Sequence, residues 1–324
     1  MKDLEDIDVK ILKELLKDGR KSFTTIAEEC HTSKDIIWKH YSEMKKAGII
    51  VGATIQYNYP CFGYEGIASI RLSVGSQHLN ELFEQLTKIP NIRPFRIYNS
   101  AYNIGVFATI KNLKDLDNIK EMLIRRHPII ASKTYIWIDV RNTPENLSLC
   151  FAQNNGQVEE KKPREKCVNN SRVKLDEIDI QIVEELNKNG RAPFSRIGQS
   201  IGVSTDTVTR RYARLVHNGF IKVSIQINPL LLGYKAILNF CIAFLSQNKM
   251  EMVMENLSKI PNVTYIVKIS GDYDFKVVAL VKDIEEMYAI NEEIMKMPDI
   301  GRIEVDMRKI PPMWPGPRQY ISTF

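Results

Sequence analysis

Threonine and arginine side chains gather on one short segment in the second half of the chain. If this segment is a helix, Thr209, Arg210 and Arg214 lie on surfaces that the apolar residues Val208 and Leu215 do not occupy. An arginine on such a helix can bind guanine through two hydrogen bonds or hold a backbone phosphate. The segment therefore predicts a DNA-binding helix, and the alternative is a solvated basic surface on a module that binds only protein. The candidate DNA-binding residues here are Ser204, Thr205, Thr207, Thr209, Arg210, Arg211 and Arg214.

A related segment occurs in the first half, with different chemistry at the same positions. Lys34, Lys39 and His40 are its candidate DNA-binding residues, and Trp38 stands where the second half has a threonine. The lysines keep positive charge, so contact with phosphates is expected to survive better than reading of bases. Two interpretations remain open for this segment: a weakened or altered DNA reader, and a head that contacts protein. We expect Trp38 to be packed or semi-buried rather than inserted into DNA.

Both segments belong to a duplication with a constant offset of 171 residues. Residues 4–50 match residues 175–221 without insertion or deletion, and further on Ile89-Pro90-Asn91 matches Ile260-Pro261-Asn262. Between these stretches Gly63 corresponds to Gly233 at an offset of 170, so one residue was gained or lost nearby. A unit that normally pairs with a copy of itself can carry both copies in one chain, so we expect an internal pseudo-two-fold axis, and the copies are free to diverge.

Each matching stretch of almost fifty residues predicts three helices. In the second copy a short helix ends at Gly202, Ser204 can cap the third helix, and Gly219 can end it. Two short helices joined by a turn that contains glycine form the helix-turn-helix pattern.

After each trihelical head the apolar period changes from helical to alternating, which predicts a connecting strand at 51–59 in the first half and at 222–228 in the second. Each half then predicts strand, helix, strand, strand, helix, strand, which is the ferredoxin-like βαββαβ unit. Its sheet carries helices on one face only, and a second such sheet is the usual cover for the other face. The expected fold class is α+β, with two winged helix-turn-helix heads and two ferredoxin-like domains with antiparallel sheets. The expected heads are 1–52 and 175–223, the βαββαβ domains 62–141 and 232–309, the linker 142–174 and the C-terminal arm 310–324.

The composition is that of an ordinary soluble protein. Of the 324 residues 44% are hydrophobic and 26% are charged, and the formal charge of +6 is compatible with a polyanionic partner without requiring one. No run approaches eighteen apolar residues and the acidic start lacks a signal-peptide pattern, so we expect a cytoplasmic protein without membrane contact. The five cysteines are scattered without a C-x-x-C pair, which indicates reduced thiols. Trp314 and Tyr320 suggest that the proline-rich tail docks on protein.

Three features together resemble the Lrp/AsnC family of feast-or-famine transcription regulators. They are the head that opens at Leu175, the third helix from Ser204 to Arg211, and the turn Gly271-Asp272-Tyr273-Asp274 within a βαββαβ domain. The resemblance covers both halves apart from linker and tail, so the chain resembles a tandem member. It implies binding to double-stranded DNA, homo-oligomers built through the βαββαβ domains, and an amino acid bound near the dimer interface. Two heads on one paired core would meet DNA about one helical turn apart, or a multiple of it.

The turn of Gly271, Asp272, Tyr273 and Asp274 has two interpretations. Glycine and aspartate are what a hairpin turn requires. The resemblance implies instead a wall of an effector site, whose backbone groups and carboxylate meet the charged ends of a small amino acid. The first copy reads Asn99-Ser100-Ala101-Tyr102-Asn103, without the glycine or either aspartate. We therefore expect one effector site, in the second copy.

Catalysis has little support in the sequence. The histidines lack a partnered serine, cysteine or carboxylate at a recognised spacing, and no glycine-rich phosphate loop follows a strand. We predict no catalytic residue, no metal and no cofactor. The alternative is a ligand-binding protein with vestigial heads, or an enzyme of the branch that resembles this family and decarboxylates a tetrapyrrole (siroheme). The Trp-Pro-Tyr-Asn sequence associated with that branch is absent.

Overall fold

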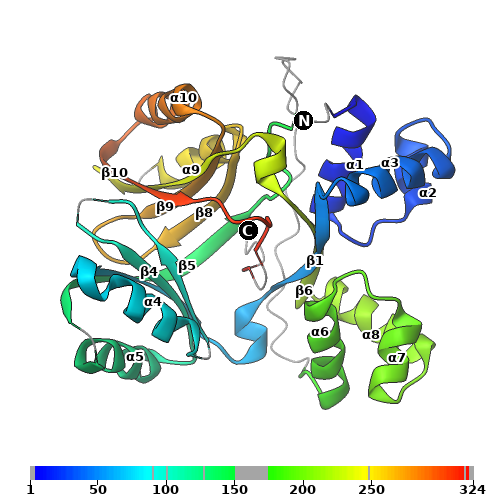
Figure 1. Cartoon of the computed structure of the whole chain (residues 1–324), viewed down its shortest axis with the longest axis horizontal. Coiled ribbons are helices and arrows are strands. Elements are labelled where there is room, and N and C mark those ends of the chain that lie inside the picture. Colours follow the sequence, from blue (N-terminus) through cyan, green and yellow to red (C-terminus); the bar gives the residue numbers. More distant parts are fainter. Residues whose placement is uncertain are drawn as a thin grey trace. The chain divides into compact units, whose positions relative to one another are not determined.

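The computed structural model describes residues 4–89, 91–99, 101–126, 128–149, 174–246, 249–316 and 319–320. The chain forms two compact units, and both halves of the sequence contribute to each. The unit of the heads comprises Met1–Asn58, Arg141–Tyr234 and Pro311–Phe324, and the unit of the sheet comprises Tyr59–Val140 and Lys235–Ile310 (Figure 1). Most of the predicted linker, residues 150–173, lies outside the described residues.

The unit of the heads contains the two predicted three-helix heads. Ser33 and Ser204 cap the third helices, because their hydroxyl oxygens accept hydrogen bonds from the backbone N–H groups of Ile36 and Thr207. The predicted cap at Ser204 is thus confirmed. The first head consists of α1 (Asp6–Lys17), α2 (Phe23–Glu29) and α3 (Lys34–Lys46), and the second of α6 (Glu177–Lys188), α7 (Phe194–Ile201) and α8 (Thr205–His217).

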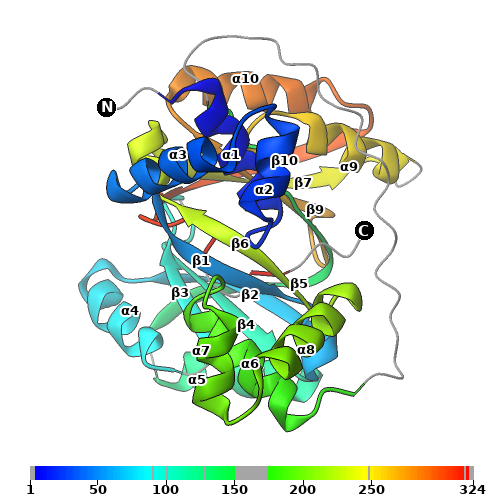
Figure 2. The same ribbon diagram turned by 90° about the vertical axis from the view of Figure 1, so that its right-hand side faces the viewer.

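An antiparallel ribbon of two strands, β1 (Ile50–Tyr57) and β6 (Ile221–Ile227), connects the heads (Figure 2). Each strand follows its own head in sequence, and each head's first helix contacts the strand of the other copy, α1 with β6 and α6 with β1. Glycine is needed at these crossings, because a Cβ at Gly19 would lie 2.7 Å from the backbone of Ser224. The strands predicted after each head are confirmed, and they pair with each other.

Two arginines at matching positions link the heads reciprocally. Arg20 donates hydrogen bonds to the carbonyl oxygens of Gly190 and Ala192, at 2.6 and 2.8 Å, and lies over the ring of Phe194. Arg191 donates a hydrogen bond of 2.5 Å to the carbonyl of Gly19, and lies over the first head's aromatic rings. The internal two-fold expected from the duplication is therefore visible in the contacts between the heads.

The C-terminal arm packs on the ribbon, as its aromatic residues predicted. Trp314 and Tyr320 are buried, and Trp314 exchanges two backbone hydrogen bonds of 2.8 Å with Ile227 of β6. The N–H of Tyr57 donates to the carbonyl of Gln319. Residues 317–318 and 321–324 of this arm lie outside the described residues.

The unit of the sheet contains both βαββαβ domains, joined in one eight-stranded sheet. Its strand order is β10-β7-β9-β8-β5-β2-β4-β3, so β8 of the second domain lies beside β5 of the first. Within each domain the order is fourth, first, third, second strand, as the ferredoxin-like fold requires. The strands are β2 (Gly66–Val74), β3 (Ile92–Arg96), β4 (Ile104–Ile110), β5 (Ile129–Asn142), β7 (Ala236–Phe244), β8 (Val263–Ile269), β9 (Phe275–Val281) and β10 (Ile300–Lys309).

Helices cover the outer face of this sheet. In the first domain, α4 (Leu79–Thr87) and α5 (Leu113–Arg126) enclose one apolar core, and in the second α9 (Met250–Lys259) and α10 (Ile284–Met295) enclose another. Alternate residues of the strands face these cores. The remaining residues form an inner face that is markedly polar, with Arg71, Asn239, Lys276 and Asp306 among its buried side chains.

The two ends of the sheet also meet. The N–H of Tyr98, just after β3, donates a 2.8 Å hydrogen bond to the carbonyl of Met307 on β10. The two domains were expected to cover each other as separate sheets, whereas they form one sheet that curves until its end strands touch. None of the helices in the described part of the chain is long and apolar enough to cross a membrane.

Candidate DNA-binding helix and inner-face polar network

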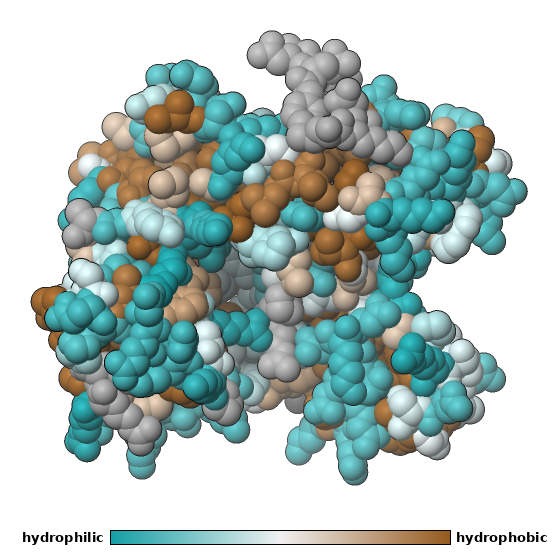
Figure 3. All heavy atoms as spheres, in the orientation of Figure 1, coloured by the Kyte–Doolittle hydropathy of each residue, from teal (hydrophilic) through white to brown (hydrophobic). Residues whose placement is uncertain are grey.

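The exposed surface of α8 carries the threonines and one arginine of the predicted DNA-binding set. Ser204, Thr205, Thr209 and Arg210 are exposed, whereas Thr207 is half-buried. The Thr209 hydroxyl donates a 2.9 Å hydrogen bond to the carbonyl of Thr205, one turn earlier. Arg210 has no hydrogen bond or ion pair to any residue that the structure describes. The side of this head seen in Figure 3 is mainly hydrophilic.

The other two arginines of α8 turn back toward α6. Arg211 donates to Asp176 at 2.6 Å and to Asp179 at 3.0 Å, and Arg214 forms an ion pair with Asp179. Asp179 is fully buried, so these arginines supply the counter-charge that its carboxylate needs. The hydrogen bond from Arg211 lowers the pKa of Asp176 to about 2. The structure thus separates Arg210 from the two arginines that hold α8 on its own head.

The first head presents a different surface at the matching positions. Lys34 and Lys39 are exposed, and Nδ1 of His40 lies 2.8 Å from Oδ1 of the buried Asp8. Trp38 is 56% exposed, although its ring lies 5.7 Å from Phe23. Trp38 was expected to be packed or semi-buried, and the structure places one side of the indole against the aromatic cluster of this head while more than half of its surface stays exposed.

The predicted effector turn contacts residues of both domains. Gly271 has φ +115°, and a Cβ there would lie 3.2 Å from the ring of Tyr135. Asp272 forms an ion pair of 2.5 Å with Lys133, and the hydrogen bond from that lysine lowers the pKa of Asp272. The carboxylate of Asp274 accepts a 2.8 Å hydrogen bond from the N–H of Phe244. Asp274 therefore has a turn-stabilising contact, while Asp272 is half exposed beside a cation of the other domain.

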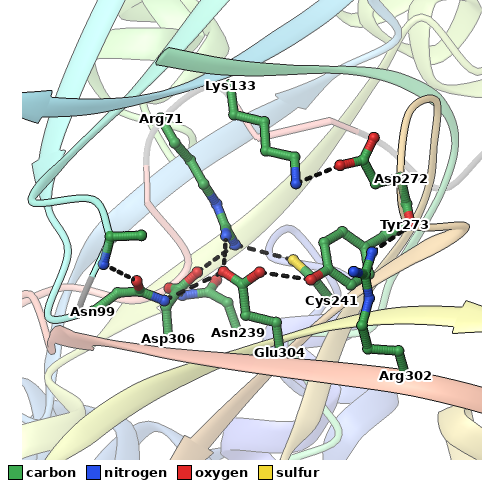
Figure 4. Close-up of polar contacts among 11 residues, drawn as sticks. Arg71, Asn99, Lys133, Asn239, Cys241, Asp272, Tyr273, Arg302, Glu304 and Asp306 are labelled. Atoms are coloured by element: carbon green, nitrogen blue, oxygen red, sulfur yellow. Dashed lines mark hydrogen bonds and ion pairs between the residues drawn. The ribbon is translucent and has the colours of Figure 1, made fainter. Parts of the chain in front are cut away.

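Tyr273 links this turn to a buried charge network on the inner face (Figure 4). Its hydroxyl donates a 2.6 Å hydrogen bond to Glu304, whose other oxygen accepts one of 2.6 Å from Arg71. Arg71 also donates to Asp306 at 2.5 Å, and Asn239 donates to the second oxygen of Asp306 at 2.7 Å. Burial and the hydrogen bond to Glu304 raise the pKa of Tyr273 to about 12. Both carboxylates are thus fully engaged with donors.

Two further cations lie on the inner face around the ring of Phe95. Nζ of Lys276 lies 5.8 Å from the ring centroid, and the guanidinium carbon of Arg308 lies 5.1 Å from it. Lys276 is 4% exposed and has no hydrogen bond or ion pair among the described residues. Burial lowers the pKa of Lys276 to about 8 and that of Arg308 to about 10. These two cations differ from Arg71, because neither has a carboxylate within ion-pair distance in the described chain.

This network is absent from the sequence-based predictions. A usable signal was the strand 275–281, where Lys276 is the one charged residue in an apolar run. A second signal was the alternation of Glu304, Asp306 and Arg308 on one face of a strand. Sequence alone could not show that these residues face Arg71, which lies more than two hundred positions earlier. Of the described residues, no group of three or more histidine, cysteine, aspartate or glutamate side chains could hold a metal ion.

Comparisons with known families agree with this architecture. Residues 175–216 match the AsnC-type helix-turn-helix domain, and residues 240–307 match the Lrp/AsnC ligand binding domain. Residues 4–51 match the winged helix-turn-helix DNA-binding model. Both heads and the second βαββαβ domain are thereby assigned by similarity as well as by geometry.

Similar proteins are named as regulators and are shorter than this chain. "HTH-type transcriptional regulator Ptr1" of Methanocaldococcus jannaschii is 32% identical over 114 residues, which are 35% of this chain and 76% of the relative. "HTH-type transcriptional regulator FL11" of Pyrococcus horikoshii is 33% identical over 130 residues, 40% of this chain and 85% of the relative. The solved structure of the siroheme decarboxylase NirDL shares the fold over 98% of this chain and 94% of its own, with a TM-score of 0.65 and 15% identity. The chain belongs to the Lrp/AsnC family of helix-turn-helix transcriptional regulators and carries the family's unit twice.

Proposed function

We propose that this regulator recognises its DNA sites mainly through α8 of the second head. The observation that supports this is the exposed set of Thr205, Thr209 and Arg210 on a capped helix of an AsnC-type helix-turn-helix domain. A helix of this kind enters the major groove, where threonine and arginine contact base edges and phosphates.

The arginines of α8 have two different roles, which their contacts distinguish. Arg210 is available to a base or a phosphate, since it has no partner in the described part of the chain. Arg211 and Arg214 neutralise Asp179, so their first role is to hold α8 against α6. Lys34 and Lys39 of the first head contribute phosphate contacts, while Ile36 and Trp38 place apolar surface where α8 has threonine.

The test begins with selection of bound fragments from genomic DNA by the purified full chain, followed by sequencing. Fluorescence anisotropy on a selected site at several salt concentrations then measures affinity, which we expect to fall steeply as salt rises. Arg210→Ala should weaken binding by at least about tenfold. Lys188→Ala is the matched control, because Lys188 is an exposed cation of the same head on α6. Weak binding without sequence preference or salt dependence would contradict the proposal.

We also propose that the βαββαβ domains bind a small effector and assemble the chain into homo-oligomers. The turn of Gly271, Asp272, Tyr273 and Asp274 belongs to the matched Lrp/AsnC ligand binding domain. Asp272 is half exposed there, so its carboxylate can meet an ammonium group. A thermal-shift panel of amino acids tests effector binding, and light scattering with and without the best ligand tests assembly. Loss of the thermal shift in Asp272→Asn would support this site.

We propose that the chain acts as a regulator and not as an enzyme. The curated relatives are named as regulators, while the likeness to the siroheme decarboxylase concerns the fold. The visible absorption spectrum of the purified protein tests this proposal. A bound tetrapyrrole that loses carboxylate groups during incubation would favour the enzymatic alternative instead.

A further inference from the structure

The inner face of the sheet contains more hydrogen-bond donors than the chain satisfies. The indole Nε1 of Trp137, the hydroxyl of Tyr135 and Nε of Arg308 are buried without a partner in the described structure. Lys276, whose side chain is 4% exposed, adds a cation without a hydrogen bond or an ion pair among the described residues. Buried donors are normally satisfied, and a group of them without acceptors indicates that an acceptor from outside the chain belongs among them.

Three of these donor groups, on Trp137, Lys276 and Arg308, belong to one continuous cluster of side chains, whereas the ring of Tyr135 lies beside Arg71. Lys276 and Arg308 share the ring of Phe95, and Lys276 also lies 5.2 Å from the centroid of Phe107. Phe107 and Trp137 have ring centroids 5.3 Å apart. The ring of Phe95 lies directly over Gly105, because a Cβ at that glycine would be 2.2 Å from Cζ of Phe95. Strands of both domains therefore hold the two cations against aromatic side chains.

The charges of the inner face identify the kind of ligand. Arg71 forms ion pairs with Glu304 and Asp306, whereas Lys276 and Arg308 have no carboxylate within ion-pair distance among the described residues. A carboxylate from outside the chain would supply the counter-charge that these two cations lack. The carboxylates already accept from Arg71, Asn99, Asn239 and Tyr273, so neither is left to pair with the ammonium of an amino acid.

From these contacts we infer that the inner face binds an organic monocarboxylate whose charge lies between Lys276 and Arg308. The aromatic rings of Phe95 and Phe107 pack against the apolar body of the ligand, and the indole N–H of Trp137 donates to its carboxylate. This site differs in residues and in ligand charge from the effector turn, and it does not depend on DNA binding by the heads.

Isothermal titration calorimetry on the full chain tests this inference with benzoate and hexanoate. We expect at least one of them to bind, while L-phenylalanine and benzyl alcohol bind at least about tenfold more weakly, because neither carries a net negative charge. Inorganic phosphate should also bind at least about tenfold more weakly, because it has no apolar body to pack against the aromatic rings. Equal binding of benzoate and L-phenylalanine would overturn the inference, and so would failure of both carboxylates to bind.

Two variants locate the ligand within the protein. Lys276→Met and Arg308→Met should each weaken carboxylate binding by at least about tenfold, since each removes a charged donor. Lys309→Met is the matched control, because Lys309 is an exposed lysine at the end of the same strand as Arg308. Circular dichroism and DNA affinity of each variant report whether the chain is still folded. Unchanged carboxylate affinity in folded Lys276→Met protein would overturn the inference.

Discussion

The two heads have the same fold and differ in the side chains that their third helices expose. In the first head His40 faces the buried Asp8, whereas in the second Arg211 and Arg214 face the buried Asp179. The first head exposes Trp38 where the second exposes a threonine. Each difference leaves the fold of the head unchanged, because the exchanged residues lie on its surface or pair with the same buried aspartate. Duplication thus allowed the binding surface to change while the caps and the reciprocal arginines stayed.

The two βαββαβ domains diverged in their interior. Arg71 pairs across the sheet with Gly105 in the first domain, and Cys241 pairs with Lys276 at the matching register in the second. A cation therefore stands on a different strand in each copy. In a symmetric dimer of identical chains these positions would carry the same residues on both sides. A single chain can place Arg71, Lys276 and the aromatic rings asymmetrically, and so build an inner face that identical subunits could not have.

The largest effect is expected from removing the inner-face cation of the first copy. Arg71→Met leaves Asp306, which is 2% exposed, without its charged partner, and should cost about 3–5 kcal/mol in the free energy of unfolding. Cys241→Ala removes the matching residue of the second copy and should cost about 1 kcal/mol. Urea denaturation measures both. Similar losses for the two variants would show that the copies are energetically equivalent.

Lys276 should have the opposite effect on stability. Its pKa is about 8 in the folded chain and near 10.5 when unfolded, so below pH 8 the folded state carries the whole desolvation cost. Lys276→Met removes that cost, and should stabilise the protein at pH 7 by about 3 kcal/mol. Between pH 8 and 10.5 Lys276 is largely neutral in the folded wild-type chain but still protonated in the unfolded chain. The stability of the wild type should therefore rise with pH in this range and approach that of the variant. Denaturation across this pH range tests the prediction, and a destabilised variant at pH 7 would contradict it.

Sequence patterns predicted the local elements well because these depend on nearby residues. The caps at Ser204 and Gly219, the βαββαβ order and the docking of Trp314 follow from periodicity, turn chemistry and aromatic content. The joining of two sheets into one depends on pairing between β8 and β5, which are far apart in sequence. The partners of Arg71 are distant for the same reason. The orientation of Arg211 toward Asp179 could not be predicted either. An arginine on a basic helix gives the same sequence pattern whether it faces DNA or its own head.

DNA affinity should respond to the second head more than to the first. Arg210→Ala should reduce affinity for a selected site by about tenfold or more, as expected for loss of an arginine contact to a base. Lys39→Ala should reduce affinity a few-fold for all sequences, and lower the slope of the salt dependence by about one, as expected for one phosphate contact. Fluorescence anisotropy at several salt concentrations distinguishes the two patterns. The reverse ranking would assign sequence reading to α3.

The reciprocal arginines should show the smallest effects and the closest agreement between copies. Arg20→Ala and Arg191→Ala each remove a guanidinium that donates to carbonyls of the opposite head and lies over its rings. Each should cost about 1–2 kcal/mol in the free energy of unfolding, from the hydrogen bonds and the cation–π contacts together. Thermal and urea denaturation of both single variants, with Lys188→Ala as an exposed control, measures the pair. If only one of the two variants lost stability, the contact between the heads would have diverged between the copies, as their surfaces have.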